Sequence, residues 1–245
     1  MRLLLALLLA AAPFAAASAT PADVGAAVAM LNRPAEDIAL DAGRKPAEVL
    51  AFERLEVGDR VLDWDAGKGY YAELMAHAVG PTGHVDALNP PAAAEASAGA
   101  WKSRLARNPN IALITSGFAD APLAPDTYNF ALMNIVYHDL YWQSDKYHLP
   151  RVEPRVILHN LYRAMKAGGV VAVIDHVGPK GDPRVTADKL HRIDPETIRY
   201  DFERAGFRLS GQSKILRNPT DDHTKLVFDP AIRGHTDRVV YRFVK

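Results

Sequence analysis

Three titratable side chains, His138, Asp139 and His176, are candidates for acid–base chemistry. They follow two apolar runs, 128–135 and 170–174, whose composition is typical of buried parallel strands. An imidazole titrates near neutral pH, so either histidine could remove a proton from a hydroxyl or an amine, and Asp139 could orient one of them. In the alternative interpretation, His138 and Asp139 only cap the helix that follows the strand.

A second candidate is the segment 61–71, which reads Val-Leu-Asp-Trp-Asp-Ala-Gly-Lys-Gly-Tyr-Tyr. It predicts a short buried strand, a tight turn containing Gly67 and Gly69, and a helix from Tyr70 to about Val79. Glycine lets the backbone approach a ligand where a Cβ would collide, and the start of the helix offers unpaired N–H groups. This arrangement is typical of the opening of a nucleotide-binding β-α-β unit.

The rest of the chain alternates predicted strands and helices. Further strands are predicted at 84–88, 111–115, 128–135 and 170–174, followed by 207–216 and 239–244, with helices at 92–107, 156–166 and 195–205. Ligands of an open α/β sheet bind beyond the carboxyl ends of its parallel strands. The pattern therefore predicts that Asn89, Asp120 and Asn134, which end or follow strands, lie on the same rim as the glycine turn.

The pattern Asp-x-x-Ala-Gly-x-Gly-Tyr-Tyr, which starts at Asp63, resembles motif I of class I S-adenosylmethionine (SAM)-dependent methyltransferases. More narrowly, it resembles a group of predicted secreted bacterial methyltransferases. The resemblance covers most of the chain after about residue 40 and includes the Lys-Ala-Gly-Gly turn at 166–169. Where the general class has the first glycine of Gly-x-Gly-x-Gly, this chain has Asp65, and the narrower group also lacks that glycine.

The resemblance implies an α/β, Rossmann-like fold with a seven-stranded, mostly parallel sheet and an antiparallel C-terminal hairpin strand. It also implies SAM as the cofactor, with binding residues carried over by position: Asp63, Asp65, Ala66, Gly67, Gly69, Tyr70, Asn89, Asp120 and Asn134. In the family, the residue at the position of Asn89 is acidic and holds the ribose hydroxyls; an amide can donate and accept in its place. The resemblance places Asp120 near the exocyclic amine of adenine.

The expected function is transfer of a methyl group from SAM to a small-molecule acceptor. Because the sulfonium is already activated, the protein must mainly align the acceptor, exclude water and remove a proton where the acceptor is a hydroxyl or an amine. The loop 217–236 joins the last two predicted strands on the same rim and is long for a hairpin, which favours a lid or wall over the substrate. Tyr137, Tyr141, Trp142 and Tyr147 could stack on a planar acceptor or simply pack.

Two other functions remain open from the sequence. The chain could be a non-catalytic exported binding or scaffold protein with a degenerate methyltransferase fold. In that case Asp65, in place of the first glycine, is one sign that the cofactor site has been lost. It could instead be a metal-dependent enzyme whose nitrogen and oxygen ligands converge on the rim: His138, Asp139, His176, Asp222 and His223. No spacing of these residues requires a metal, so the sequence assigns no metal ligand.

The N-terminus has the pattern of a cleaved secretory signal peptide. Arg2 gives the positive start, 3–12 is the apolar core, and Ala17-Ser18-Ala19 is a small-x-small cleavage site. We therefore expect a periplasmic or secreted protein, cleaved after Ala19 and without stable membrane insertion, whose residues 20–245 form a single domain with a helical cap at 20–55.

Composition narrows the partners. The 245 residues have a formal net charge of +0, which gives no reason to expect a nucleic acid as a partner and leaves a small-molecule substrate. The chain has no cysteine, so disulfides and thiolate zinc sites are excluded. The oligomeric state is not determined by the sequence.

Overall fold

The structure, a computed structural model, describes residues 20–245, and the predicted signal peptide at 1–19 lies outside the described residues. The described chain contains a seven-stranded sheet. Its strands are β1 (Arg60–Trp64), β2 (His84–Asn89), β3 (Ile111–Thr115), β4 (Tyr128–Asn134), β5 (Met165–His176), β6 (Arg208–Ser213) and β7 (Arg238–Val244).

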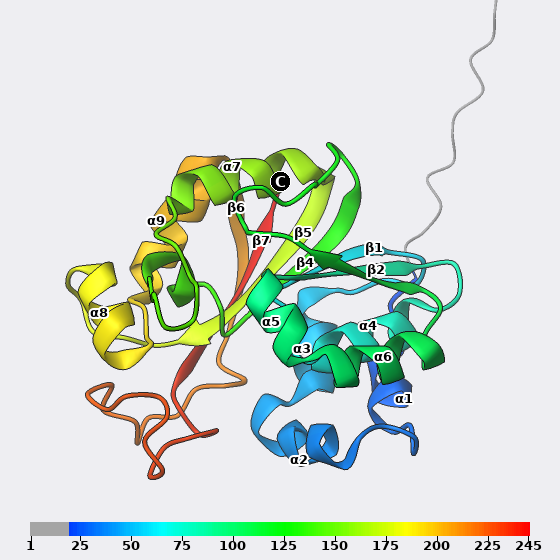
Figure 1. Cartoon of the computed structure of the whole chain (residues 1–245), viewed down its shortest axis with the longest axis horizontal. Helices are drawn as coiled ribbons and strands as arrows, with labels where there is room; N and C mark the ends of the chain where they lie inside the picture. Colours follow the sequence, from blue (N-terminus) through cyan, green and yellow to red (C-terminus); the bar gives the residue numbers. More distant parts are fainter. Residues whose placement is uncertain (1–19) are drawn as a thin grey trace, which may run out of the picture.

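The strand order is β3-β2-β1-β4-β5-β7-β6 (Figure 1). Strands β1 to β5 pair in parallel, and β7 runs antiparallel to both of its neighbours, β5 and β6. The predicted fold class is confirmed: an α/β sheet, mostly parallel, with an antiparallel C-terminal hairpin strand. The order reverses between β1 and β4, and a doubly wound sheet binds its ligands at such a switch point.

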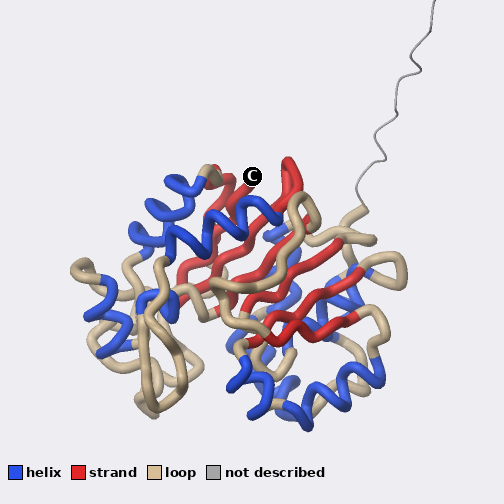
Figure 2. The backbone as a smooth tube through the Cα atoms, turned by 45° about the horizontal axis from the view of Figure 1, so that its top comes forward, coloured by secondary structure: helices blue, strands red, loops and turns tan. Residues whose placement is uncertain are grey.

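Helices cover both faces of the sheet (Figures 1 and 2). One face carries α1 (Val24–Val28), α3 (Pro46–Glu53), α4 (Tyr70–Val79) and α6 (Ala98–Arg107), and the other carries α7 (Pro154–Ala164) and α9 (Pro195–Ala205). Further helices lie toward the carboxyl ends of the strands: α2 (Ala35–Arg44), α5 (Pro91–Ala96), the 3-10 helix η1 (His138–Tyr141) and α8 (Pro183–Leu190). None of the helices in 20–245 is both long and apolar enough to cross a membrane.

The local signals in the sequence explain where several helices begin and end. Helix α4 spans the predicted range from Tyr70 to Val79, directly after the glycine turn. Helix α9 begins with Pro195 after Asp194, whose carboxylate accepts from a backbone N–H of the first turn, and ends at Gly206 in the left-handed region (φ 104°).

Several elements differ from the sequence prediction. The predicted helix 92–107 is two helices, α5 and α6, which meet at Ser97; its hydroxyl donates to the carbonyl oxygen of Ala93 and competes with the helical hydrogen bonds. The predicted turn at 167–169 lies inside β5, where the register against β4 shifts and Gly168 takes a φ of 78°. Helix α8 is not in the prediction.

Candidate functional site

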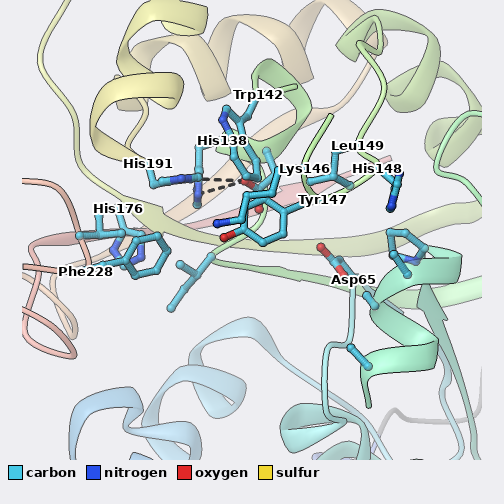
Figure 3. Close-up of a pocket in the computed structure, with 17 residues that line it drawn as sticks. Asp65, His138, Trp142, Lys146, Tyr147, His148, Leu149, His176, His191 and Phe228 are labelled. Carbon is cyan, nitrogen blue, oxygen red and sulfur yellow. Dashed lines mark ion pairs between the residues drawn. The ribbon is translucent and has the colours of Figure 1, made fainter. Parts of the chain in front are cut away.

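Two cavities meet at Asp65, directly after β1. The first, which we call the turn cavity, has a volume of about 390 Å³, lies between the glycine turn and α2, and is lined by Arg44 and Asp63 among others. The second, the histidine cavity, has a volume of about 550 Å³ and is lined by His138 and His191 among others (Figure 3). Both lie at the carboxyl ends of the parallel strands, the edge at which the sequence predicts a site.

Most of the predicted site residues lie in one of these cavities. The turn cavity contains Asp63, Asp65, Ala66, Gly67, Tyr70 and Asn134. The histidine cavity contains Asp65 again, with His138, Asp139 and His176. The other three predicted residues, Gly69, Asn89 and Asp120, lie outside both cavities.

The side chain of Asn89 holds the glycine turn. It is fully buried, its Oδ1 accepts from the N–H of Gly67 at 2.9 Å, and its Nδ2 donates to the carbonyl oxygen of Gly67 at 2.8 Å. The indole Nε1 of Trp101 donates to the same carbonyl oxygen at 2.8 Å. In this structure, therefore, the Asn89 amide shapes the turn rather than facing either cavity. Asp120 is exposed on the loop after β3.

The two glycines of the turn differ in the space around them. Gly67 has a φ of 56°, and no atom of the described chain would lie within 4 Å of a Cβ placed on it. Gly69 has a φ of 85°, and a Cβ there would lie 2.8 Å from Trp101 and 2.7 Å from Arg104. Only Gly67 therefore leaves open space beside the turn, whereas Gly69 is required by the packing of α6.

Arg104 is a buried cation that ties the turn to two helices. Its guanidinium donates to the carbonyl oxygen of Lys68 and forms ion pairs with Glu73 of α4 and Asp37 of α2. Arg104, Glu73 and Asp37 are each less than a tenth exposed. Because a buried pair is costly to break, these contacts fix α2 over the turn cavity.

Two carboxyl groups near the turn have raised pKa values. Burial and, to a smaller extent, Asp139 raise the pKa of Asp65 to about 7, and His138 opposes the shift. Burial also raises the pKa of Asp63 to about 8, and the neighbouring Asp65 adds to the shift. Both side chains are therefore poised to ionise when a cation enters the cavities.

His138 is oriented by Asp175, a residue that the sequence analysis did not single out. The fully buried Asp175 carboxylate contacts His138 Nδ1 at 2.8 Å and accepts from the backbone N–H of His138 at 2.8 Å. Burial opposes a charge on His138 and is the largest single influence on its pKa, but Asp175 and Asp139 outweigh it and raise the pKa to about 9. At neutral pH these neighbours favour a protonated His138.

His176 has the opposite electrostatic environment. Burial, together with the nearby cations His138 and Arg238, holds the pKa of His176 well below its usual value. Its Nδ1 lies 2.6 Å from the hydroxyl of Thr236. Of the two predicted bases, His176 therefore has the neutral form that a proton acceptor requires, whereas His138 supplies positive charge.

The residue after α8 and residues of the loop 217–236 complete the histidine cavity. His191, directly after α8, packs its ring 4.5 Å from that of Trp142 and 5.1 Å from that of Phe228, measured between centroids. The loop is anchored by a buried bidentate pair between Arg192 and Asp221 at 2.9 and 3.0 Å. The loop therefore forms a wall of the histidine cavity. No local sequence signal indicates that His191 belongs to the site.

Only part of the other predicted clusters reaches the histidine cavity. Trp142 and Tyr147 line it, whereas Tyr137 and Tyr141 pack behind it and donate to Asp201. Of the five histidines and aspartates that the sequence suggests as metal ligands, His138 and Asp139 lie close to His191. Asp222 and His223 bond elsewhere: Asp222 accepts from Thr224, and His223 Nε2 lies 3.0 Å from Asp237.

Comparison with solved structures identifies the fold class. A SAM-dependent methyltransferase from Aquifex aeolicus is 22% identical, with a TM-score of 0.60 over 87% of this chain and 99% of that one. Fibrillarin from Aeropyrum pernix, solved with natively bound SAM, is 14% identical, with a TM-score of 0.55 over 84% of this chain and 76% of that one. The cyclase SpnF is 16% identical, with a TM-score of 0.56 over 86% of this chain and 82% of that one.

The chain therefore has the fold of class I SAM-dependent methyltransferases. No protein-family model matches the sequence. No curated protein matches it either.

Replacing each turn glycine by alanine separates strain from packing. Gly67→Ala should lower the free energy of unfolding by about 1–2 kcal/mol, the cost of a left-handed residue with a Cβ. Gly69→Ala should lower it by about 2–5 kcal/mol, because the Cβ also meets Trp101 and Arg104. Urea unfolding measures both. Equal losses would show that α6 yields and does not require Gly69.

Asn89→Asp tests the structural role of Asn89. The aspartate cannot donate to the carbonyl oxygen of Gly67, so we expect a loss of about 1–3 kcal/mol in the free energy of unfolding. Asn160→Asp is a matched control, since the exposed Asn160 amide of α7 donates a long 3.3 Å hydrogen bond to the carbonyl oxygen of Ala119. Unchanged stability together with tighter SAM binding in Asn89→Asp would instead support a ribose-binding role for Asn89.

Proposed function

We propose that this protein is a SAM-dependent methyltransferase that acts on a small molecule. The observation that carries the proposal is the pair of cavities at the switch point of a methyltransferase fold, one beside the open side of Gly67 and the other rich in aromatic and titratable side chains. SAM, when bound, would supply an activated methyl group on a sulfonium.

The chemistry of the turn cavity suits the amino-acid end of SAM, which carries a carboxylate and an ammonium group. Arg44 lines the cavity, and its guanidinium lies 4.4 Å from the centroid of the Tyr70 ring, which helps to orient it. Asp63 and Glu36 line the same cavity and offer carboxylates. A cation and acids in one small cavity are what a zwitterion requires.

Asp65 decides whether SAM fits, because it lines both cavities. Its carboxylate points into the histidine cavity (Figure 3). SAM is a cation, and a positive sulfonium near Asp65 would favour the ionised carboxylate and be stabilised by it. We infer that Asp65 selects for the charged cofactor.

The position of Asp65 also favours a second candidate function. If the carboxylate obstructs the cofactor, the protein is a non-catalytic binding protein that retains the fold and uses the histidine cavity for another ligand. The fold alone does not decide, since the similar structures include a cyclase.

The histidine cavity suits a planar acceptor. Trp142, Tyr147 and Phe228 provide apolar surface on which a ring could stack. His176, neutral at neutral pH, could accept a proton from an acceptor hydroxyl or amine, and a protonated His138 could stabilise the anion that results. Two histidines with opposed pKa shifts thus divide the two tasks.

We also propose that the mature protein starts near Thr20 and acts in the periplasm or outside the cell. The support is the charge, apolar core and cleavage pattern of residues 2–19. In that location the enzyme would depend on SAM outside the cytoplasm.

Calorimetry with SAM and S-adenosylhomocysteine on chelator-treated residues 20–245 tests the proposal. SAM carries a positive sulfonium, whereas the sulfur of S-adenosylhomocysteine is uncharged. Asp65→Asn should therefore weaken SAM binding about tenfold and leave the affinity for S-adenosylhomocysteine nearly unchanged. The pKa of Asp65 is raised to about 7 in the free protein, so SAM must displace its proton below that pH. SAM affinity should therefore fall as the pH drops below about 7, and this fall should be smaller in Asp65→Asn, in which Asp63 still titrates.

Asp65→Gly distinguishes the two candidate functions. It restores the first glycine of the general motif at a position whose φ is already 53°. If wild type binds neither compound and Asp65→Gly binds both, the carboxylate is an obstruction and the non-catalytic function is correct. If neither protein binds SAM, the methyltransferase proposal is wrong.

A further inference from the structure

Three side chains of the histidine cavity place ligand atoms close together: the adjacent His138 and Asp139 of η1, and His191, which is about fifty residues further along the chain. His138 Nε2 lies 3.4 Å from Asp139 Oδ1, and His191 Nδ1 lies 3.7 Å from the same oxygen. All three atoms lie within 4.8 Å of one another. Figure 3 shows the two imidazole rings meeting at these ion pairs on one side of the cavity.

These separations match those of a metal site. Nitrogen and oxygen ligands bind zinc at about 2.0–2.2 Å, which places two ligand atoms about 3.3–3.6 Å apart at the tetrahedral angle. The His138–Asp139 and Asp139–His191 separations are already close to this range. The site thus needs only small side-chain movements to hold an ion.

The surroundings of His138 are those of a metal-binding histidine. Metal-bound imidazoles characteristically contact a carboxylate through the second ring nitrogen, which fixes the ring orientation. Asp175, fully buried, contacts His138 Nδ1 at 2.8 Å and also accepts from the backbone N–H groups of His138 and His176. This leaves Nε2 directed at Asp139, and an ion there takes the place of the proton between them.

The ring of His191 is also held in place. Its centroid lies 4.5 Å from that of Trp142, in an edge-on contact, and 5.1 Å from that of Phe228, in a tilted contact; the His138 ring lies 5.6 Å away. An imidazole fixed on several sides loses little conformational freedom when it binds an ion. A fixed ring is a feature of a preorganised ligand.

We propose that His138, Asp139 and His191 bind a divalent first-row transition metal ion, such as Zn²⁺ or Fe²⁺. Two imidazoles and one carboxylate favour these ions over Mg²⁺ and Ca²⁺, which prefer oxygen ligands. Three protein ligands leave coordination positions open, and all three line the histidine cavity. A small molecule with an oxygen or nitrogen donor could bind the ion there, stacked against the aromatic side chains.

Metal titration of the chelator-treated protein, without SAM, tests this site separately from the cofactor proposal. Calorimetry with Zn²⁺ should show one bound equivalent, and Mg²⁺ should bind far more weakly. Co²⁺ should give the visible absorption of a site with nitrogen and oxygen ligands, since the chain has no thiolate to offer. SAM binding by the metal-free protein is then measured independently, so either proposal can fail alone.

Variants locate the ion. His191→Ala and Asp139→Asn should each weaken Zn²⁺ binding at least tenfold, and Asp175→Asn should weaken it about 10–100-fold through His138. His235→Ala, an exposed histidine outside the cavity, is the matched control and should bind as wild type does. Circular dichroism and thermal unfolding verify that each variant is folded; His191 and Asp139 are both partly exposed, so their variants are less prone to misfolding than a variant of the buried His138.

Two outcomes would overturn the proposal. One is the absence of stoichiometric Zn²⁺ and Co²⁺ binding by the wild-type protein, which would leave the three residues as an ordinary ion-pair cluster. The other is wild-type affinity in folded His191→Ala and Asp139→Asn, which would place the ion elsewhere.

Discussion

The site depends on how the carbonyl oxygen of Gly67 is held. It accepts from both Asn89 and Trp101, and the next carbonyl, that of Lys68, accepts from Arg104. These three donors come from β2 and α6, so the turn after β1 is fixed by the crossover that follows it. A backbone in the left-handed region persists only where its surroundings hold it, and here buried hydrogen bonds do so. The open side of Gly67 faces the turn cavity as a consequence.

These long-range hydrogen bonds explain which parts of the site the sequence could predict and which it could not. The strand, the glycine turn and α4 are encoded within about a dozen residues, and the structure has α4 at the predicted Tyr70–Val79. The rim position of Asn89 was also predicted, but not that its amide would bond Gly67, because that depends on the register between β1 and β2. No local pattern indicates the contacts that Trp101 and Arg104 make, since these contacts join residues more than 30 positions apart.

Long-range assembly also explains why His191 and Asp175 were missed. His191 follows α8, a helix that the prediction omits although Asp182 and Pro183 mark its start, and it reaches the cavity only because α8 packs on η1. Asp175 looked like one more polar residue at a strand end, yet its burial beneath η1 makes it the partner of His138. Sequence pattern indicates which edge of a parallel sheet binds ligands, whereas tertiary packing decides which side chains meet there.

The distribution of charge ties the two cavities together. Asp65 lies where they meet, and its pKa is set first by burial and then by Asp139 and His138 of the histidine cavity. A cation bound at His138 and Asp139 would therefore change the pKa of Asp65, and a cation beside Asp65 would change the pKa of His138. Coupling of this kind is reciprocal, because each ligand changes the affinity of the other by the same factor. If both the cofactor and the metal bind, their like charges repel each other, and an acceptor that carries negative charge would lessen this repulsion.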